Sequence, residues 1–228
     1  MRRTGQAGYR TVLFDLDGTL SASAPGILGS LQRAFAEVGV PWVDDATARA
    51  LLGPPFSHSL PPLVGEHNLP AVVASYRRHY VEEGALLNTS RYDGILEVVS
   101  ALFDGGIRLA VATSKPEPHA IRIVQHLELA DYFWTVGGDT VDGRRDSKAQ
   151  VIGEVLGRLG NPPPESVLMV GDRSHDVLGA AAHGLDCAGA LWGYGTRAEL
   201  TNAGALRLCA TPAEVLELVR GSATEQAG

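Results

Sequence analysis

The run from Thr11 to Leu20 restricts the fold of this chain more than any other stretch. Four β-branched or apolar residues, Thr11 to Phe14, are followed at once by two carboxylates, Asp15 and Asp17, and then by a glycine. Such a run is typical of a buried parallel strand, whose carboxyl end is where open α/β sheets bind ligands. Two buried anions side by side require a cation or a shared proton. The sequence therefore predicts a metal or proton site at this strand end.

Beyond residue 93 the chain alternates between strand-like and helix-like patterns. Apolar runs are separated by segments whose apolar residues recur with the helical period. The strands expected there are 108–113, 132–136, 166–170, 187–192 and an edge strand at 207–210. The helices expected there begin at Ile95, after Pro116, and at Lys148, Asp176 and Thr211. Alternating strands and helices build a doubly wound parallel sheet, so the predicted fold class is α/β.

The segment 21–88 interrupts this alternation. It contains four helical patterns, at 27–38, 44–52, 59–66 and 70–83, and no convincing strand. Because the insertion falls between the first and second strands, we expect it to form a separate lid over the carboxyl edge of the sheet. The predicted domains are a catalytic core of residues 1–20 and 89–228 and an all-helical cap of residues 21–88. Only residues 221–228 are expected to be disordered.

The net charge, the cysteines and the first residues restrict the possible partners and the cellular location of this protein. The net charge is −7, which argues against nucleic-acid binding through a basic surface. Cys187 and Cys209 have no C-x-x-C spacing and are predicted to be buried thiols. The basic leader 1–8 precedes no long apolar run, so we predict neither export nor a membrane span. The expected protein is cytoplasmic and a monomer or a homodimer, and a small anionic substrate would have to be bound by local cations.

Polar residues mark two further strand ends and helix starts. Thr113 and Ser114 follow an apolar strand at the mouth of a helix, where a hydroxyl and free N–H groups suit a phosphate. The simpler interpretation is that one of them only caps the helix. Lys148 opens a later helix, where a cation opposes the helix dipole unless an anion lies nearby. Lys115 has the same placement and is the rival of Lys148 as a phosphate partner.

The last marked strand end carries a pair of carboxylates. Gly171 and Asp172 follow the predicted strand 166–170, and Asp176 lies four residues after Asp172. Both acids can reach one cation across a strand-to-helix turn. Oxygen ligands without a cysteine or histidine cluster favour Mg²⁺ over Zn²⁺. His175 lies between the two acids and is interpreted as a solvated or hydrogen-bonded loop residue rather than a base.

These four sites, in this order, resemble the motifs of the haloacid dehalogenase superfamily, most of whose members are Mg²⁺-dependent phosphatases. The matching residues are the run Asp15 to Leu20, Thr113, Lys148, and the pair Asp172 and Asp176. The resemblance implies a Rossmann-like core with an inserted helical cap. It also implies that the partner is a small phosphorylated metabolite, a phosphomonoester that the protein would hydrolyse as a phosphatase through an aspartyl-phosphate.

The resemblance implies a role for each matching residue. Asp15 would be the nucleophile, and Asp17 would protonate the leaving alcohol and then deprotonate the attacking water. Thr113 and Lys148 would also serve catalysis. Phosphate would be bound by Leu16, Asp17, Thr113, Ser114 and Lys148. The cofactor Mg²⁺ would be held by Asp15, the carbonyl of Asp17, Asp172 and, through water, Asp176.

Within the superfamily, the lid length and the segments 23–27 and 92–94 are most similar to phosphoglycolate phosphatases. Ala22 is a departure, because those relatives usually have aspartate there, and we expect it to affect cap placement more than chemistry. A carboxylated substrate such as 2-phosphoglycolate would need a cationic partner in the cap. The arginines available for that contact are Arg33, Arg49, Arg77 and Arg78.

Three alternatives use the same residues differently. Asp17 and Gly18 argue against a haloacid dehalogenase, which has no leaving alcohol to protonate. A sugar phosphomutase would use the same residues and return the phosphoryl group to the sugar. A non-catalytic regulator on this fold is a third hypothesis, and the intact acids together with Lys148 argue against it.

Overall fold

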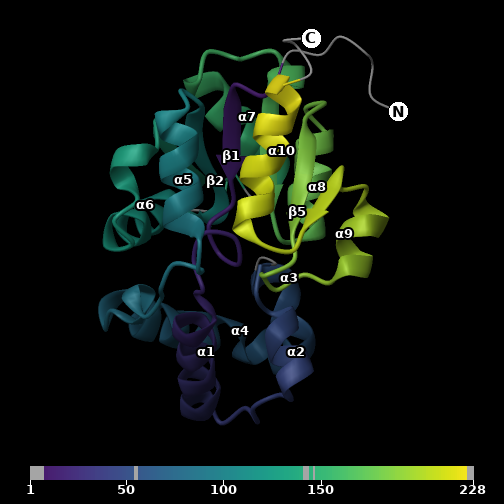
Figure 1. The fold of residues 1–228 in the computed structure, drawn as a ribbon. Coiled ribbons are helices and arrows are strands. Elements are labelled where there is room, and N and C mark those ends of the chain that lie inside the picture. Colours follow the sequence, from purple (N-terminus) through teal and green to yellow (C-terminus); the bar gives the residue numbers. More distant parts are fainter. Residues whose placement is uncertain (1–7, 54–55, 141–143, 146, 225–228) are drawn as a thin grey trace.

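A six-stranded parallel sheet forms the core of the computed structural model, which describes residues 8–53, 56–140, 144–145 and 147–224 (Figure 1). Its order is β3-β2-β1-β4-β5-β6. The strands are β1 (Thr11–Phe14), β2 (Arg108–Pro116), β3 (Thr135–Asp139), β4 (Val167–Gly171), β5 (Asp186–Ala190) and β6 (Arg207–Cys209). The chain adds strands on one side of β1 and then on the other, so β1 and β4 flank the switch point where such sheets bind ligands. The predicted doubly wound parallel sheet is confirmed.

Helices cover both faces of this sheet. Val12 and Phe14 pack into one apolar cluster with residues of α5, α6 and α10, whereas Leu13 packs into another with α7, α8 and α9. The helices of the core are α5 (Ile95–Asp104), α6 (Glu117–His126), α7 (Lys148–Arg158), α8 (Ser174–Ala181), α9 (Arg197–Ala203) and α10 (Pro212–Thr224). Burial of both faces explains why the central strands have continuous apolar runs.

The remaining helices form a block beyond the carboxyl end of β1 (Figure 1). They are α1 (Ala24–Val38), α2 (Asp45–Ala50), α3 (Phe56–Ser59), α4 (Pro61–Arg77), a π-helical turn (Arg78–Glu82) and a 3₁₀ turn (Ala85–Leu87). The two segments that join this cap to the core run side by side, because the Ala22 N–H donates to the Ser90 carbonyl at 2.8 Å. Ala22 therefore lies in the hinge, as its place in the sequence predicted.

The second half of the cap differs from the prediction. Two helices are expected at 59–66 and 70–83, and α4 is indeed two helical pieces, but they are divided by non-helical backbone at Gly65 (φ 73°, ψ 153°) and not between 66 and 70. Glycine adopts this backbone conformation without a steric penalty, so the break falls there and not at Pro70, which lies inside the helix. The last predicted turns are π-helical, at Arg78–Glu82. Such turns disturb the helical period on which the prediction relied.

Several predicted bounds in the core are also wrong. β2 extends to Pro116, and the strand expected at 132–136 begins only at Thr135, after a 3₁₀ turn at Ala130–Tyr132. The strand expected at 187–192 ends at Ala190, and α9 was not predicted. α10 continues to Thr224, so residues 221–224 are helical; residues 225–228 and the leader 1–7 lie outside the described residues.

The structure also bears on the state of the two cysteines and on membrane-spanning helices. Cys187 and Cys209 are buried free thiols, as predicted. Among the described residues, no helix has both the length and the apolar character needed to cross a bilayer.

Candidate active site

Backbone contacts hold the loop after β1 in place. The Asp15 N–H donates to the Val170 carbonyl of β4 at 2.9 Å. Gly18 has a φ of +87°, and a Cβ atom there would lie 2.2 Å from Asp172 Oδ2. Only glycine therefore allows the loop to pass so close to the end of β4. The Trp192 indole N–H donates to the Thr19 carbonyl at 3.0 Å and supports the loop from the end of β5.

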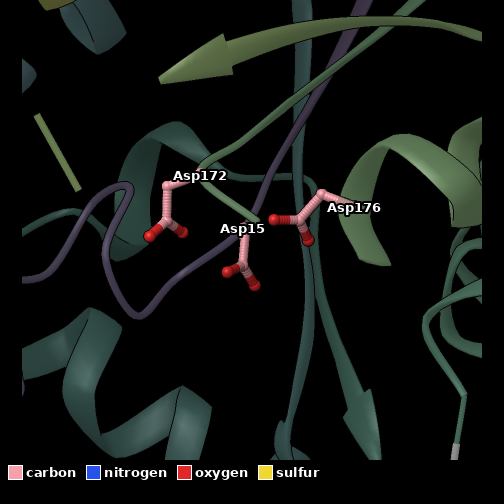
Figure 2. A group of neighbouring side chains, drawn as sticks. All are labelled: Asp15, Asp172 and Asp176. Carbon is pink, nitrogen blue, oxygen red and sulfur yellow. The ribbon is translucent and has the colours of Figure 1, made fainter. Parts of the chain in front are cut away.

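Three carboxylates meet beside this loop, two that follow the adjacent strands β1 and β4 and one from the first turn of α8. Asp15, Asp172 and Asp176 each offer one oxygen, and these three atoms lie within 4.8 Å of one another. Figure 2 shows Asp172 and Asp176 on either side of Asp15. The register pairs Phe14 with Val170, so the residues that follow the two strands are neighbours. All three side chains are buried.

Lys148 provides the counter-charge for this cluster. Its Nζ lies 2.6 Å from Asp15 Oδ1 and 2.7 Å from Asp176 Oδ1. The helix that carries it, α7, is capped by Ser147, whose side chain accepts from the Gln150 N–H. Burial would lower the pKa of Lys148, but the two carboxylates outweigh it and raise that pKa above its usual value. The ammonium group is therefore charged throughout the physiological range.

One ammonium group does not neutralise three buried carboxylates. Burial raises the pKa of Asp15 to about 7, against the attraction of Lys148. Burial and then the negative charges of Asp176 and Asp15 raise the pKa of Asp172 well above its usual range. For Asp176, burial acts in the same direction, but Lys148 and other partners lower the pKa below its usual value. Two of the acids therefore require protons or a metal cation.

The donor set of this cluster fits a hard divalent cation. The three side chains offer only carboxylate oxygens, which are the ligands that Mg²⁺ and Ca²⁺ prefer. The cluster contains neither a thiolate nor an imidazole, the ligands typical of structural zinc sites. The residues present therefore fit the Mg²⁺ site that the sequence predicted.

Asp17 lies in a second charged group. The Lys115 Nζ lies 3.1 Å from Asp17 Oδ2 and 2.7 Å from the hydroxyl of Tyr80 in the cap. The other oxygen, Asp17 Oδ1, is buried without a hydrogen-bond partner in the described chain. Lys148, the lysine that the sequence favoured, pairs with Asp15, whereas its rival Lys115 pairs with Asp17.

The predicted phosphate-binding groups lie at the same sheet edge. Thr113 is buried two residues beyond Val111, the register partner of Phe14, and its hydroxyl accepts from the Lys115 N–H at 3.2 Å. Ser114 is half-buried at the same strand end. Within the described part of the chain, the backbone N–H groups of Leu16 and Asp17 have no recorded hydrogen-bond partner. These N–H groups are available to phosphate oxygens.

Sequence reasoning missed two residues that support the site. The Tyr194 N–H donates to Asp172 Oδ2 at 2.7 Å. The Arg173 guanidinium donates to Glu199 at 3.0 Å and to the carbonyl of Leu52 in the cap. The glycines on both sides of Tyr194, just after an apolar strand, were a usable signal for a close backbone approach. No local pattern identifies the contact of Arg173 with the cap, because its partner lies 121 residues away.

Three characterised relatives are similar to most of this chain. Tyrosine-protein kinase PtkA of Mycobacterium tuberculosis is 44% identical over 197 residues, which cover 85% of this chain and 67% of that protein. The 5'-nucleotidase of Pseudomonas aeruginosa is 37% identical over 194 residues, covering 84% and 87%. The phosphoglycolate phosphatase of Aquifex aeolicus is 33% identical over 188 residues, covering 81% and 86%.

A solved structure has a similar fold, and a family model matches most of the chain. The crystal structure of a predicted phosphatase from Clostridium acetobutylicum aligns with a TM-score of 0.87 at 33% identity, covering 94% of this chain and all of that one. The model of haloacid dehalogenase-like hydrolases matches residues 12–190, a span that contains every predicted site residue. The chain therefore belongs to the haloacid dehalogenase-like hydrolase family, as its motifs indicated.

Proposed function

We propose that this protein is a Mg²⁺-dependent phosphatase that hydrolyses a small phosphomonoester through an aspartyl-phosphate on Asp15. The observation that carries the proposal is the position of Asp15, which lies at the end of β1, paired with Lys148 and grouped with Asp172 and Asp176. The family match and the relatives named as phosphatases support phosphomonoester hydrolysis.

The first step joins Asp15 to phosphorus. A carboxylate oxygen of Asp15 attacks, the bond between phosphorus and the ester oxygen breaks, and Asp17 gives a proton to the leaving alcohol. Thr113, Lys148 and the free N–H groups of the loop hold the phosphoryl oxygens, over which the transition state spreads its charge. Pairing with Lys148 also orients the attacking carboxylate.

The second step releases phosphate. Asp17 takes a proton from water, whose oxygen attacks the same phosphorus, and the bond from phosphorus to Asp15 breaks. Inorganic phosphate leaves, and both carboxyl groups return to their starting states. Asp15, Asp172 and Asp176 would hold Mg²⁺. The bound ion supplies charge neutralisation at the phosphoryl oxygens and keeps the nucleophile ionised.

Phosphate release from a generic aryl phosphate tests this proposal. We expect wild-type turnover to depend on Mg²⁺ and Asp15→Asn to lower it by more than about a hundredfold, because the substitution keeps the shape but removes the nucleophile. Asp104→Asn is the matched control, since Asp104 is exposed on α5. Wild-type turnover without Mg²⁺, or a variant that retains more than a hundredth of the rate, would contradict the proposal.

The substrate to test first is 2-phosphoglycolate. Relatives named phosphoglycolate phosphatase come from Pseudomonas aeruginosa, Aquifex aeolicus and Rhodospirillum rubrum, at 31 to 33% identity. A nucleoside monophosphate is the competing substrate, because a relative at 37% identity is named 5'-nucleotidase. Phosphate release from both compounds, together with sugar phosphates, ranks them by kcat/KM. A sugar phosphate that is isomerised without phosphate release would instead identify a phosphomutase.

A second candidate function is phosphoryl transfer to a tyrosine. It rests on the name of the Mycobacterium tuberculosis relative, tyrosine-protein kinase PtkA, at 44% identity. In that reaction a tyrosine hydroxyl of a protein, and not water, would be the final acceptor of a nucleotide γ-phosphoryl group. Incubation with ATP and a tyrosine-containing protein distinguishes the two functions: phosphotyrosine that is lost in Asp15→Asn supports the kinase, and Mg²⁺-dependent phosphate release alone supports the phosphatase.

A further inference from the structure

Lys115 is a second buried cation for which the proposed hydrolysis has no role. Its side chain is 6% exposed, and its ammonium group contacts Asp17 and the Tyr80 hydroxyl. It also lies 4.7 Å from the centre of the Tyr80 ring. An ammonium group has three N–H donors, and only two partners are recorded for it in the part of the chain that the structure describes. One donor is available to a ligand.

The position of Lys115 next to Asp17 places it beside the leaving group. In the proposed mechanism Asp17 protonates the ester oxygen, so that oxygen must come within about 3 Å of the Asp17 carboxylate. Lys115 contacts this same carboxylate, whereas Lys148 contacts Asp15, the nucleophile. The sequence contains no lysine other than these two. They thus divide the site into a phosphoryl side and a leaving-group side.

Tyrosine rings from the cap enclose the leaving-group side. Tyr80 is 3% exposed, and its ring stacks on Tyr76 with the centroids 5.0 Å apart. Phe56 packs edge-on against Tyr76 at 4.8 Å. These three rings form one aromatic cluster, and its member Tyr80 contacts Lys115.

Two carboxylates fix the π-helical turn that carries Tyr80 through its neighbour His79. The ring nitrogens of the buried His79 lie 2.8 Å from Glu37 and 2.9 Å from Glu83. Because each nitrogen faces a carboxylate, both ends of the imidazole are fixed. This anchor holds the neighbouring Tyr80 against Lys115, and π-helical turns are frequent at functional sites.

Three of the four cap arginines expected to bind a carboxylate are less suited to it than Lys115. Arg33 pairs with Glu83 at 2.9 Å and is 59% exposed. Arg78 pairs with Glu37, and Arg49 is exposed on α2. Each of these three would have to leave a partner or the solvent to reach a substrate.

Two arginines add positive charge to the region of α6 on which Lys115 acts. Burial and then the positive charges of Lys115, Arg122 and Arg77 lower the pKa of His119 on α6. Three cations, Lys115, Arg77 and Arg122, therefore act on one region at the seam between cap and core, together with the single negative charge of Asp17 beside Lys115. A negatively charged leaving group is favoured there over a neutral one.

We propose that Lys115 and Tyr80 form a leaving-group subsite that selects a phosphomonoester whose alcohol carries a carboxylate one or two carbons from the ester oxygen. Lys115 binds the carboxylate through a charge-assisted hydrogen bond, and Tyr80 holds Lys115 and closes the subsite. A short spacing is compatible with the 3.1 Å between Lys115 Nζ and Asp17 Oδ2, since each group reaches its own ligand atom over about 3 Å. The inference rests on the proposed phosphatase activity and restricts its substrate class.

A matched pair of substrates tests the inference. 2-Phosphoglycolate and ethyl phosphate have the same two-carbon length, and only the first carries a carboxylate. We expect Lys115→Gln to lower kcat/KM for 2-phosphoglycolate by about tenfold to a hundredfold, the usual effect of losing a charged hydrogen bond, and to change that for ethyl phosphate by less than threefold. Tyr80→Phe should also lower kcat/KM for 2-phosphoglycolate more than kcat/KM for ethyl phosphate, but by a smaller factor than Lys115→Gln. Arg49→Gln, which removes an exposed cap cation, is the control and should change neither substrate.

A binding measurement provides a readout that is independent of turnover. Because the chain has two lysines, protein labelled with ¹⁵N-lysine gives two side-chain ammonium signals, and Lys115→Arg identifies one of them. Addition of glycolate, the leaving alcohol, should shift the Lys115 signal and leave the Lys148 signal in place. A shift of Lys148 alone, or of neither signal, would contradict the assignment of Lys115.

The outcomes separate this inference from the proposed function. Equal losses for both substrates in Lys115→Gln would show that Lys115 acts on Asp17 or on the phosphoryl group, and would overturn the inference while the phosphatase stands. The same holds if the wild type prefers ethyl phosphate. If the wild type with Mg²⁺ releases phosphate from neither substrate nor from an aryl phosphate, both the function and the inference are refuted.

Discussion

Replacing Asp15 by asparagine should stabilise the metal-free protein at neutral pH while it abolishes turnover. Asp15 is buried, and burial raises its pKa from the usual 3.8 to about 7 despite the pairing with Lys148. The asparagine side chain has the same shape and mimics the protonated acid. The variant therefore avoids the free energy that the wild type loses when this carboxyl group ionises inside the fold.

Proton linkage gives the size of this stabilisation and its dependence on pH. Between these two pKa values the unfolded chain has lost the Asp15 proton and the native chain still holds it, so the free energy of unfolding falls as the pH rises. The stabilising contribution is complete below pH 3.8 and is lost by about pH 7. A rise from 3.8 to about 7 corresponds to about 4 kcal/mol. For a chain of this length, that is a difference of about 10 °C in Tm.

Urea denaturation of both proteins in EDTA, at pH 4 and at pH 8, measures this effect. We expect the free energy of unfolding of Asp15→Asn, relative to the wild type, to be greater at pH 8 than at pH 4 by about 4 kcal/mol. Adding Mg²⁺ at pH 8 should raise the free energy of unfolding of the wild type and leave that of the variant unchanged, since only an intact site binds the ion. A difference between the proteins that does not change with pH would refute the reasoning.

Three further substitutions test other parts of the site. Asp172→Ala should raise the Mg²⁺ concentration needed for half-maximal activity by more than tenfold with little change in KM, because it removes a proposed ligand; an unchanged metal titration would place the ion elsewhere. Lys148→Met should lower the free energy of unfolding in EDTA by about 3 to 5 kcal/mol, since it leaves Asp15 and Asp176 without their buried partner; a loss below about 1 kcal/mol in urea denaturation would contradict that pairing. Gly18→Ala should reduce both Tm and kcat, because a Cβ atom 2.2 Å from Asp172 displaces the loop or the acid; wild-type kcat and Tm would show that the loop tolerates a side chain.

Local sequence determined the parallel sheet of this protein and the ends of its strands at which polar residues gather. Continuous apolar runs predicted buried parallel strands, and the sharp change from Phe14 to Asp15 predicted where one of them ends. Because parallel strands share one carboxyl edge, residues far apart in the sequence had to lie near one another, and the structure groups Asp15, Asp172 and Asp176 as that rule requires. Element ends were predicted less well, since Gly65 and the π-helical turn interrupt the helical period.

Only the tertiary structure decided how the charges pair. Lys115 and Lys148 each lie where the sequence pattern predicts the start of a helix, and that pattern could not assign either one to an acid. The fold brings Lys148 to Asp15 across 133 residues, and it brings Tyr80 of the cap to Lys115. Such pairings depend on how α7 and the cap pack against the sheet, which is the sum of many long-range contacts. No window of sequence contains that information, so the leaving-group side of the site became visible only in the folded chain.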